Sequence, residues 1–305
     1  MSTYAYVMLM FGGDKYLPGI LVMGYTIRYC GAIYDIVVMV TNDVSESSVR
    51  EMKKMNMKVV HVNYLDYKIN TKFMSKKQIE RYSWMSKSFT KWNCLELEEY
   101  KKVLFLDCDM IVVKNLDSVF ETNTPAGVFE SPYDERLLKP SGKKSGFPNF
   151  YNSIIVKPKE INNALTKKGF VTTAACVLLS PDKKDFKKLC NMLSEKPFGF
   201  NCTSGMDEQA ISYYYSLYKN GPKKNWINLG PSYAFLEWKY KELKVKPPIP
   251  DKDVKVIDFV GSEKPWMVEK NKYPDVRFWY KHAIMLHKSF PDINLEVYNS
   301  EDLNE

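Results

Sequence analysis

Apolar and polar positions follow two alternating patterns along the first hundred residues. Short apolar runs bounded by charged or turn residues predict buried strands, and apolar positions three and four residues apart predict helices packed on them. The predicted strands are residues 4–11, 34–40, 58–62 and 103–106, and the predicted helices are residues 16–29, a segment capped by Ser45, and residues 78–100 with Trp84, Phe89, Trp92 and Leu95 on one face. This alternation indicates an α/β fold with a mostly parallel sheet covered on both faces.

The pattern is weaker beyond residue 115. The predicted strands in this part are residues 171–179 and 254–259, and the predicted helices are residues 206–218 and a segment that follows Pro181 and ends near Glu195. Residues 131–149 are rich in Pro, Gly and Lys without periodicity, which predicts a long loop. Residues 244–250 are predicted to be a proline-rich connector.

The segment with the clearest chemistry is residues 102–113, KVLFLDCDMIVV. Its apolar run ends at Asp107 and Asp109, which are separated only by Cys108. In open α/β sheets, ligands bind beyond the carboxyl ends of the strands, and unpaired carboxylates would be costly to bury there. Such a pair can hold a hard divalent cation, which can in turn bind a diphosphate. Asp-x-Asp also occurs by chance in solvated turns, but its place after a buried strand favours the metal site.

Composition and charge narrow the class of protein. Apolar residues make up 45% of the 305 residues and aromatic residues 14%, which supports a large core. The net charge of +8 is spread along the chain and suits an anionic ligand, an acidic partner or a membrane surface. The absence of a basic block interleaved with aromatic residues argues against nucleic acid as a partner. The absence of a Gly-x-Gly-x-x-Gly or Walker motif argues against a dinucleotide dehydrogenase and a P-loop NTPase.

Cysteine spacing and hydropathy bear on location. The six cysteines form no Cys-x-x-Cys pair and no zinc-site spacing, which is typical of reduced core cysteines. The apolar N-terminus lacks the basic leader and cleavage site of a signal peptide, and no apolar run approaches the roughly 18 residues of a membrane span. We therefore expect a cytoplasmic protein without a signal peptide or membrane span.

Several segments, in order over about residues 4–268, resemble the glycogenin-like retaining glycosyltransferases of glycosyltransferase family 8. They are AYVMLMFGGDKYLPGILVMG at residues 5–24, TKWNC at 90–94, KVLFLDCDMIVVKNLDSVF at 102–120, DEQ at 207–209 and DFVGSEKPW at 258–266. The resemblance implies a GT-A-type, Rossmann-like mixed sheet flanked by helices on both faces. It also implies a glycosyltransferase domain over residues 1–270, with a C-terminal extension, residues 271–305, that packs on this domain.

The resemblance assigns roles to individual residues. It implies that the donor is bound by Leu9, Phe11, Tyr16, Lys91, Asp107, Cys108, Gly261 and Lys264, and that the metal is held by Asp107, Asp109 and Asp258. It implies catalytic roles for Gln209, Glu208 and Lys264, with Gln209 beneath the transferred sugar. It places Thr173, Ala174 and Asp207 on the acceptor side.

Two positions depart from the family pattern. Thr173-Ala174-Ala175 stands where the family usually has Asn-Ser-Gly or Asn-Ala-Gly, which affects acceptor and sugar specificity because a hydroxyl replaces an amide. Asp258 stands where the family has a metal-binding histidine, and an aspartate is also a competent oxygen ligand.

The implied activity is transfer of glucose or galactose from a UDP-sugar, with retention and with Mn²⁺ or Mg²⁺, to an unidentified hydroxyl of a saccharide, polyol or protein. Some relatives glycosylate a tyrosine of their own, and Tyr233 lies in the comparable region. The sequence leaves a homodimer open. Two alternatives also stay open: a sugar nucleotidyltransferase, which the loop after the first strand fits poorly, and a non-catalytic nucleotide-sugar-binding protein that keeps the fold.

Overall fold

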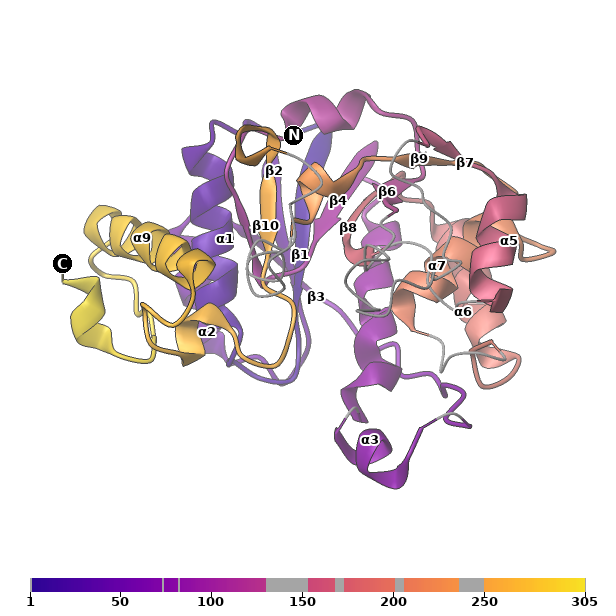
Figure 1. Cartoon of the computed structure of the whole chain (residues 1–305), viewed down its shortest axis with the longest axis horizontal. Helices are drawn as coiled ribbons and strands as arrows, with labels where there is room; N and C mark the ends of the chain where they lie inside the picture. Colours follow the sequence, from indigo (N-terminus) through magenta and orange to yellow (C-terminus); the bar gives the residue numbers. More distant parts are fainter. Residues whose placement is uncertain are drawn as a thin grey trace, which may run out of the picture. The chain divides into compact units, whose positions relative to one another are not determined.

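The computed structural model describes residues 2–72, 74–81, 83–129, 153–167, 173–200, 206–235 and 250–304. The chain forms two compact units, each built from separated stretches of sequence (Figure 1). The first unit comprises Met1–His61, Leu106–Val119 and Pro231–Glu305, and the second comprises Val62–Phe105 and Phe120–Gly230. The expected boundary at residue 270 stays a prediction, and residues 271–305 belong to the first unit.

Three parallel strands form the sheet of the first unit. Their order is β3-β2-β1, and they span Tyr4–Met10 (β1), Asp35–Val40 (β2) and Lys58–His61 (β3). The helices that follow β1 and β2 are α1 (Leu17–Tyr29) and α2 (Glu46–Lys54). Ser45 caps α2 as predicted, because its side chain accepts a hydrogen bond from the backbone of Ser48 at 3.2 Å.

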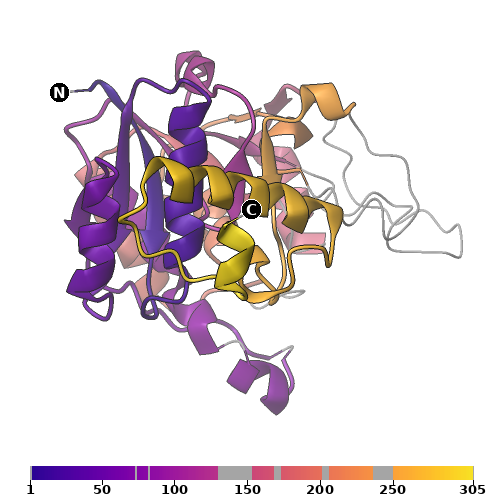
Figure 2. The same ribbon diagram turned by 90° about the vertical axis from the view of Figure 1, so that its left-hand side faces the viewer.

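A second, two-stranded sheet in the first unit carries the residues of chemical interest. β5 (Met110–Val112) pairs antiparallel with β10 (Val256–Asp258), and Asp258 lies opposite Met110. The C-terminal helix α9 (Pro274–Ser289) packs across α1, as both ribbon views show (Figures 1 and 2). Short 3₁₀ helices complete the unit at Pro231–Tyr233, Asp251–Asp253, Pro265–Met267 and Ser300–Leu303.

The second unit is built on strands of mixed direction. Their order is β4-β8-β6-β9-β7, and they span Lys102–Leu106 (β4), Thr173–Leu179 (β8), Ala126–Val128 (β6), Trp226–Asn228 (β9) and Ile155–Val156 (β7). β6 is antiparallel to β8 and parallel to β9. The helices are α3 (Lys76–Arg81), α5 (Pro158–Lys167), α6 (Lys183–Ser194) and α7 (Asp207–Ser216), with 3₁₀ helices at Ser83–Glu96 and Asp117–Glu121, the latter beginning in the first unit.

The predicted helix over residues 78–100 is corrected by the structure. α3 ends at Arg81, and Ser83–Glu96 is a 3₁₀ helix. Phe89, Trp92 and Leu95 are buried together, whereas Trp84 is 45% exposed. A 3₁₀ helix has three residues per turn, so positions 89, 92 and 95 share one face and position 84 does not.

Most of the other predicted strands and helices are confirmed within one or two residues. The predicted loop over residues 131–149 lies outside the described residues, as does most of the predicted connector over residues 244–250.

Candidate active site

Three predicted metal ligands lie in one part of the first unit. Asp107 and Asp109 are half-buried in the short link between β4 and β5. Asp258, at the end of β10, is only 4% exposed. The backbone N–H of Phe259 donates to the carbonyl of Asp109 at 3.0 Å, which fastens the aspartate link to the end of β10.

Lys264 is a buried cation beside these carboxylates. Its ammonium donates to the Asp109 carboxylate and, at 3.0 Å, to the carbonyl oxygen of Phe259. Burial by itself lowers the pKa of Lys264, but the charge and hydrogen bond of Asp109 outweigh burial and raise it, with further contributions from Tyr16 and Asp258. Lys264 is 5% exposed and stays charged, so it is not a solvated loop lysine.

Tyr16 and Trp266 join this region to the start of α1. The two rings pack edge to face, with centroids 5.6 Å apart, and the Trp266 indole donates to the carbonyl of Lys15 at 2.9 Å. The pKa of Tyr16 is raised, mainly by burial. The charge of Lys264 acts to lower this pKa, and the carboxylates of Asp109 and Asp107 act to raise it. The Tyr16 hydroxyl therefore lies in the electric field of the same charged groups.

Three more residues predicted to bind the sugar donor, Leu9, Phe11 and Gly261, also belong to the first unit. Leu9 is buried within β1, and Phe11 is half-buried directly after it. Gly261 has a φ of +120°, a conformation that side chains rarely adopt, and open space where a Cβ would lie. A ligand could therefore approach the backbone closely at Gly261.

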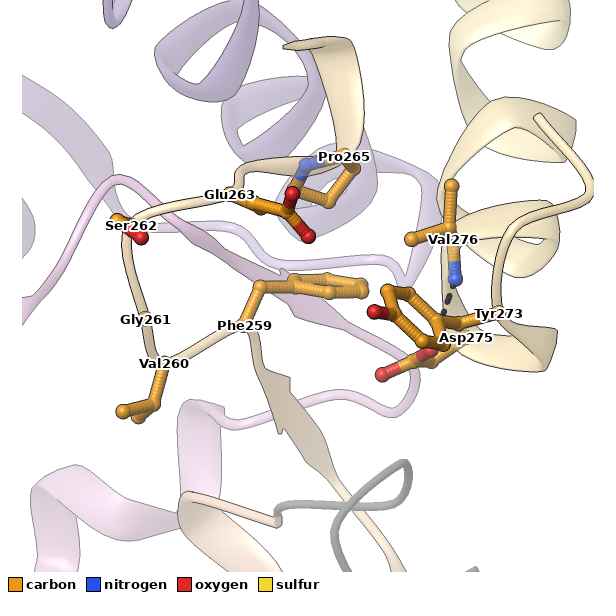
Figure 3. Close-up of a pocket in the computed structure, with 9 residues that line it drawn as sticks. All are labelled: Phe259, Val260, Gly261, Ser262, Glu263, Pro265, Tyr273, Asp275 and Val276. Atoms are coloured by element: carbon orange, nitrogen blue, oxygen red, sulfur yellow. Dashed lines mark hydrogen bonds between the residues drawn. The ribbon is translucent and has the colours of Figure 1, made fainter. Parts of the chain in front are cut away.

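A pocket of about 250 Å³ lies beside the loop that carries Gly261. Its lining combines residues 259–263 and Pro265 with three residues at the start of α9: Tyr273, Asp275 and Val276. Figure 3 shows the side chains of Phe259, Glu263 and Tyr273 converging, whereas Val260 points away. The sequence did not predict this pocket, because residues 273–276 lie in no motif and their place beside Gly261 depends on contacts between separate segments.

The second unit holds the predicted sugar-side residues. Lys91 forms an ion pair with Asp207, with 2.9 Å between Nζ and Oδ2, and the two side chains are 14% and 3% exposed. Burial and the neighbouring Asp207 raise the pKa of Glu208 well above its ordinary value, against a smaller lowering by Lys91. Asp207 is therefore engaged by Lys91, whereas Glu208 keeps its proton to higher pH than an exposed glutamate.

Gln209 and Thr173 are both engaged in local hydrogen bonds. The Gln209 side-chain oxygen accepts from the backbone N–H of Met206 at 2.8 Å and so caps α7. The Thr173 hydroxyl accepts from the backbone of Ala175 at 3.1 Å, and Ala174 is buried. The structure places Asp207, Glu208 and Gln209 together in the first turn of α7, where acidic residues also complement the helix dipole.

The three predicted metal ligands have the chemistry of a divalent-cation site. Asp107, Asp109 and Asp258 offer hard carboxylate oxygens, and the Lys264 ammonium already lies against Asp109 as a stand-in cation. Within the part of the chain that the structure describes, no three His, Cys, Asp or Glu side chains are yet grouped to hold a metal. The residues thus fit a divalent cation chemically, and binding it would require their side chains to rearrange.

Comparison with known protein families identifies the chain. The model of the family "Glycosyl transferase family 8" matches residues 8–174, more than half of the sequence. The chain belongs to glycosyltransferase family 8. The expected resemblance is thereby confirmed, and membership of the family makes the chain a glycosyltransferase that uses a nucleotide-sugar donor and an acceptor.

Two relatives extend the family 8 match over more of the chain. The uncharacterized protein R707 of Acanthamoeba polyphaga mimivirus is 30% identical over 226 aligned positions, and the match covers 71% of this chain and 78% of that protein. The glycogenin of Komagataella phaffii is 25% identical over a gapped alignment of 323 positions that covers 99% of this chain and 70% of the glycogenin.

A solved structure supports the fold. The galactosyltransferase LgtC, in complex with donor and acceptor sugar analogs, matches with a TM-score of 0.57 at 16% identity and covers 95% of this chain and 100% of LgtC. The predicted GT-A-type α/β fold is confirmed. Among the helices that the structure describes, none combines the length and the apolar character that crossing a bilayer requires.

Proposed function

We propose that this family 8 chain transfers a hexose, glucose or galactose, from a UDP-sugar to a hydroxyl acceptor with retention of anomeric configuration. The observation that supports this most is the grouping of Asp109, Asp258 and buried Lys264 in the first unit. Carboxylates beside a buried ammonium suit a ligand made of a divalent cation and a diphosphate. Mn²⁺ or Mg²⁺ is the proposed cofactor.

The donor-binding roles follow from the chemistry of each residue. Asp107, Asp109 and Asp258 would hold the divalent cation, which supplies Lewis acidity that offsets the charge developing on the departing UDP. Lys264 binds the diphosphate as a second positive charge, and the open backbone at Gly261 lets a phosphate approach. We assign contacts to the uracil to Leu9, Phe11 and Tyr16, and a further part in donor binding to Cys108, which lies between the two aspartates.

The sugar-side roles remain with the second unit. We propose that the acceptor hydroxyl attacks the face from which UDP departs and that the leaving phosphate takes its proton. Lys91 positions Asp207 through their buried ion pair, and it is the proposed contact to the donor sugar. Glu208 and Gln209 stabilise the positive charge that develops on the transferred sugar, and Thr173 and Ala174 contribute to acceptor selection.

A separate molecule is the proposed acceptor. Tyr233, the tyrosine considered for self-glycosylation, is 8% exposed, and its hydroxyl accepts a hydrogen bond from Lys255 at 2.8 Å. A buried, hydrogen-bonded hydroxyl is a poor nucleophile for a bulky donor. A saccharide, polyol or other protein is therefore favoured.

Release of UDP tests the proposal. The purified chain is incubated with UDP-glucose, UDP-galactose or GDP-mannose, each with Mn²⁺, with Mg²⁺ or with EDTA, and free nucleotide is measured. We expect slow hydrolysis of a UDP-hexose in the presence of metal, with little release in EDTA and none from GDP-mannose. Equal release in EDTA would contradict the cofactor, and no release or binding of any UDP-sugar would favour the non-catalytic alternative.

A further inference from the structure

The contact between Lys264 and Asp109 conflicts with the two separate roles proposed for these residues. The proposed function, on which this inference rests, gives Asp109 to a divalent cation and Lys264 to a diphosphate. In the structure, however, the Lys264 ammonium donates directly to the Asp109 carboxylate, and both side chains are largely buried. A carboxylate oxygen that accepts from an ammonium cannot also coordinate a divalent cation without bringing two positive charges together.

The surroundings of Lys264 explain why its charge is held there. The carboxylates of Asp107, Asp109 and Asp258 would together carry a formal charge of −3, and the charge of Lys264 reduces it. A second hydrogen bond, to the Phe259 carbonyl at 3.0 Å, fixes the ammonium next to the end of β10. A lysine ammonium can move away from such a carboxylate because it is attached through a flexible four-carbon chain. The chain thus contains its own counter-ion for the proposed metal ligands.

We propose that Lys264 is an exchangeable cation of this site: its ammonium would leave Asp109 when a divalent cation is bound there and would then bind the diphosphate. Lys264 therefore opposes binding of the metal alone and favours binding of the metal together with UDP. Metal and UDP strengthen each other's binding by the same factor, because coupling between two ligands is reciprocal. The substrate class that this site takes is a metal–nucleoside diphosphate complex rather than its separate parts.

The proposal predicts that loss of the Lys264 ammonium changes the affinities for Mn²⁺ alone and for UDP in opposite directions. Binding of Mn²⁺ alone is measured by the electron paramagnetic resonance of free Mn²⁺, and binding of UDP at saturating Mn²⁺ by calorimetry. For Lys264→Met we expect Mn²⁺ alone to bind at least about fivefold more tightly and UDP at least about fivefold more weakly than in the wild type. A purely structural role would weaken both or neither.

Lys272→Met is the matched control. Lys272 forms an ion pair with Glu263 at 2.8 Å in the same part of the chain, but it is exposed. We expect its loss to leave both affinities within about twofold of the wild type. The proposal is overturned if Lys264→Met binds Mn²⁺ alone no more tightly than the wild type, or if Lys272→Met gives the same pattern. If the wild type itself binds no UDP with Mn²⁺, the proposed function fails instead.

Lysine footprinting of the wild type keeps the proposal testable if Lys264→Met does not fold. Reductive methylation followed by mass spectrometry reports how accessible each lysine amine is. We expect Lys264 to be protected in the free protein, to react at least about threefold faster with saturating Mn²⁺ alone, and to be protected again with Mn²⁺ and UDP. The exposed Lys272 should react at one rate throughout. Unchanged protection of Lys264 under saturating Mn²⁺ would overturn the proposal.

Discussion

Asp258 is the residue at which this chain departs most from the metal-binding pattern of its family. A histidine there would leave two carboxylates, whereas Asp258 adds a third and lies within the electric field of Lys264. A third carboxylate favours hard cations, including Mg²⁺, over metals that prefer nitrogen. The substitution thus predicts a difference in metal preference.

We predict that Asp258→His still supports UDP release with Mn²⁺ but loses at least about tenfold of its Mg²⁺-dependent activity. The measurement is a titration of both metals against UDP release. Asp253→Asn, an exposed carboxylate of the same segment, is the control and should behave as the wild type. If Asp258→Ala retains wild-type activity with both metals, Asp258 is not a ligand and instead only closes the turn before Gly261.

The raised pKa of Glu208 predicts how the stability of the protein depends on pH. Its pKa is raised by burial and by Asp207, so the unfolded chain loses this proton from about pH 4.3, its ordinary pKa, while the folded chain keeps it. The stability due to Glu208 is complete below that pH and is lost as pH rises toward the folded pKa. Glu208→Gln removes this loss.

We therefore expect the melting temperature of Glu208→Gln, relative to the wild type, to be higher at pH 8 than at pH 5. Thermal unfolding of both proteins at the two pH values measures it. Glu301→Gln, an exposed acid near the C-terminus, should show no such trend. A difference between Glu208→Gln and wild type that is independent of pH would show that Glu208 ionises normally.

The sequence revealed the aspartate pair of the site but not the contacts that join distant site residues. Asp107 and Asp109 stood out because they end an apolar strand, and burial of their neighbours follows from that pattern. The ion pair of Lys91 with Asp207 joins residues far apart in the sequence, and no local pattern encodes such a contact. The pairing of Lys264 with Asp109 was missed for the same reason.

Helix α1 packs closely against the aspartate link, residues 107–109, at Gly19. A Cβ added at Gly19 would overlap the backbone carbonyl of Cys108 and the Trp266 ring. A Cβ at Gly24, one helical turn and a half further on, would meet only the flexible end of Met57. Gly19 therefore permits α1 to lie directly against Cys108, the residue between Asp107 and Asp109, and Gly24 has no such role.

We predict that Gly19→Ala destabilises the protein by about 1–3 kcal/mol and weakens binding of UDP with Mn²⁺, because the overlap must displace the aspartate link. Gly24→Ala, its control, should change stability by less than about 1 kcal/mol, since alanine is the better helix former and Met57 can move. Urea unfolding and calorimetry measure the two effects. Equal behaviour of both variants would show that α1 does not position the link.

The length of an element decided how well it could be predicted. β1, β2 and β8 have six or seven residues, which is enough for an apolar run to be recognised. β6, β7 and β9 have only two or three residues, too few to show a period, and their place depends on pairing with strands distant in sequence. The 3₁₀ helix at Ser83–Glu96 was mistaken for α-helix because apolar positions three residues apart, as at Phe89, Trp92 and Leu95, also fall within one face of an α-helix.

At the scale of the whole molecule, the account predicts that ligand binding raises stability. A ligand present at 100 times its dissociation constant stabilises the folded state by about 2.7 kcal/mol, which corresponds to roughly 3–6 °C for a protein of this size. We expect a thermal shift in this range with UDP and Mn²⁺ together, and a shift below about 2 °C with UDP and EDTA. An equal shift in EDTA would place UDP in a site that needs no metal.

The fold class of the whole molecule was predictable because it depends on many residues at once. Alternating strands and helices constrain an α/β architecture even when single boundaries are wrong. The division into two units, each assembled from separated stretches, was not predictable, because it depends on contacts between distant segments.

We propose that a cation held by carboxylates drives departure of UDP from a UDP-hexose. The most direct measurement is the rate of UDP release, with Mn²⁺, by Asp109→Asn compared with Asp253→Asn and the wild type. We predict a loss of at least about a hundredfold for Asp109→Asn with an unchanged circular dichroism spectrum, and a wild-type rate for Asp253→Asn. Release by Asp109→Asn at near the wild-type rate, at limiting Mn²⁺, would contradict the account.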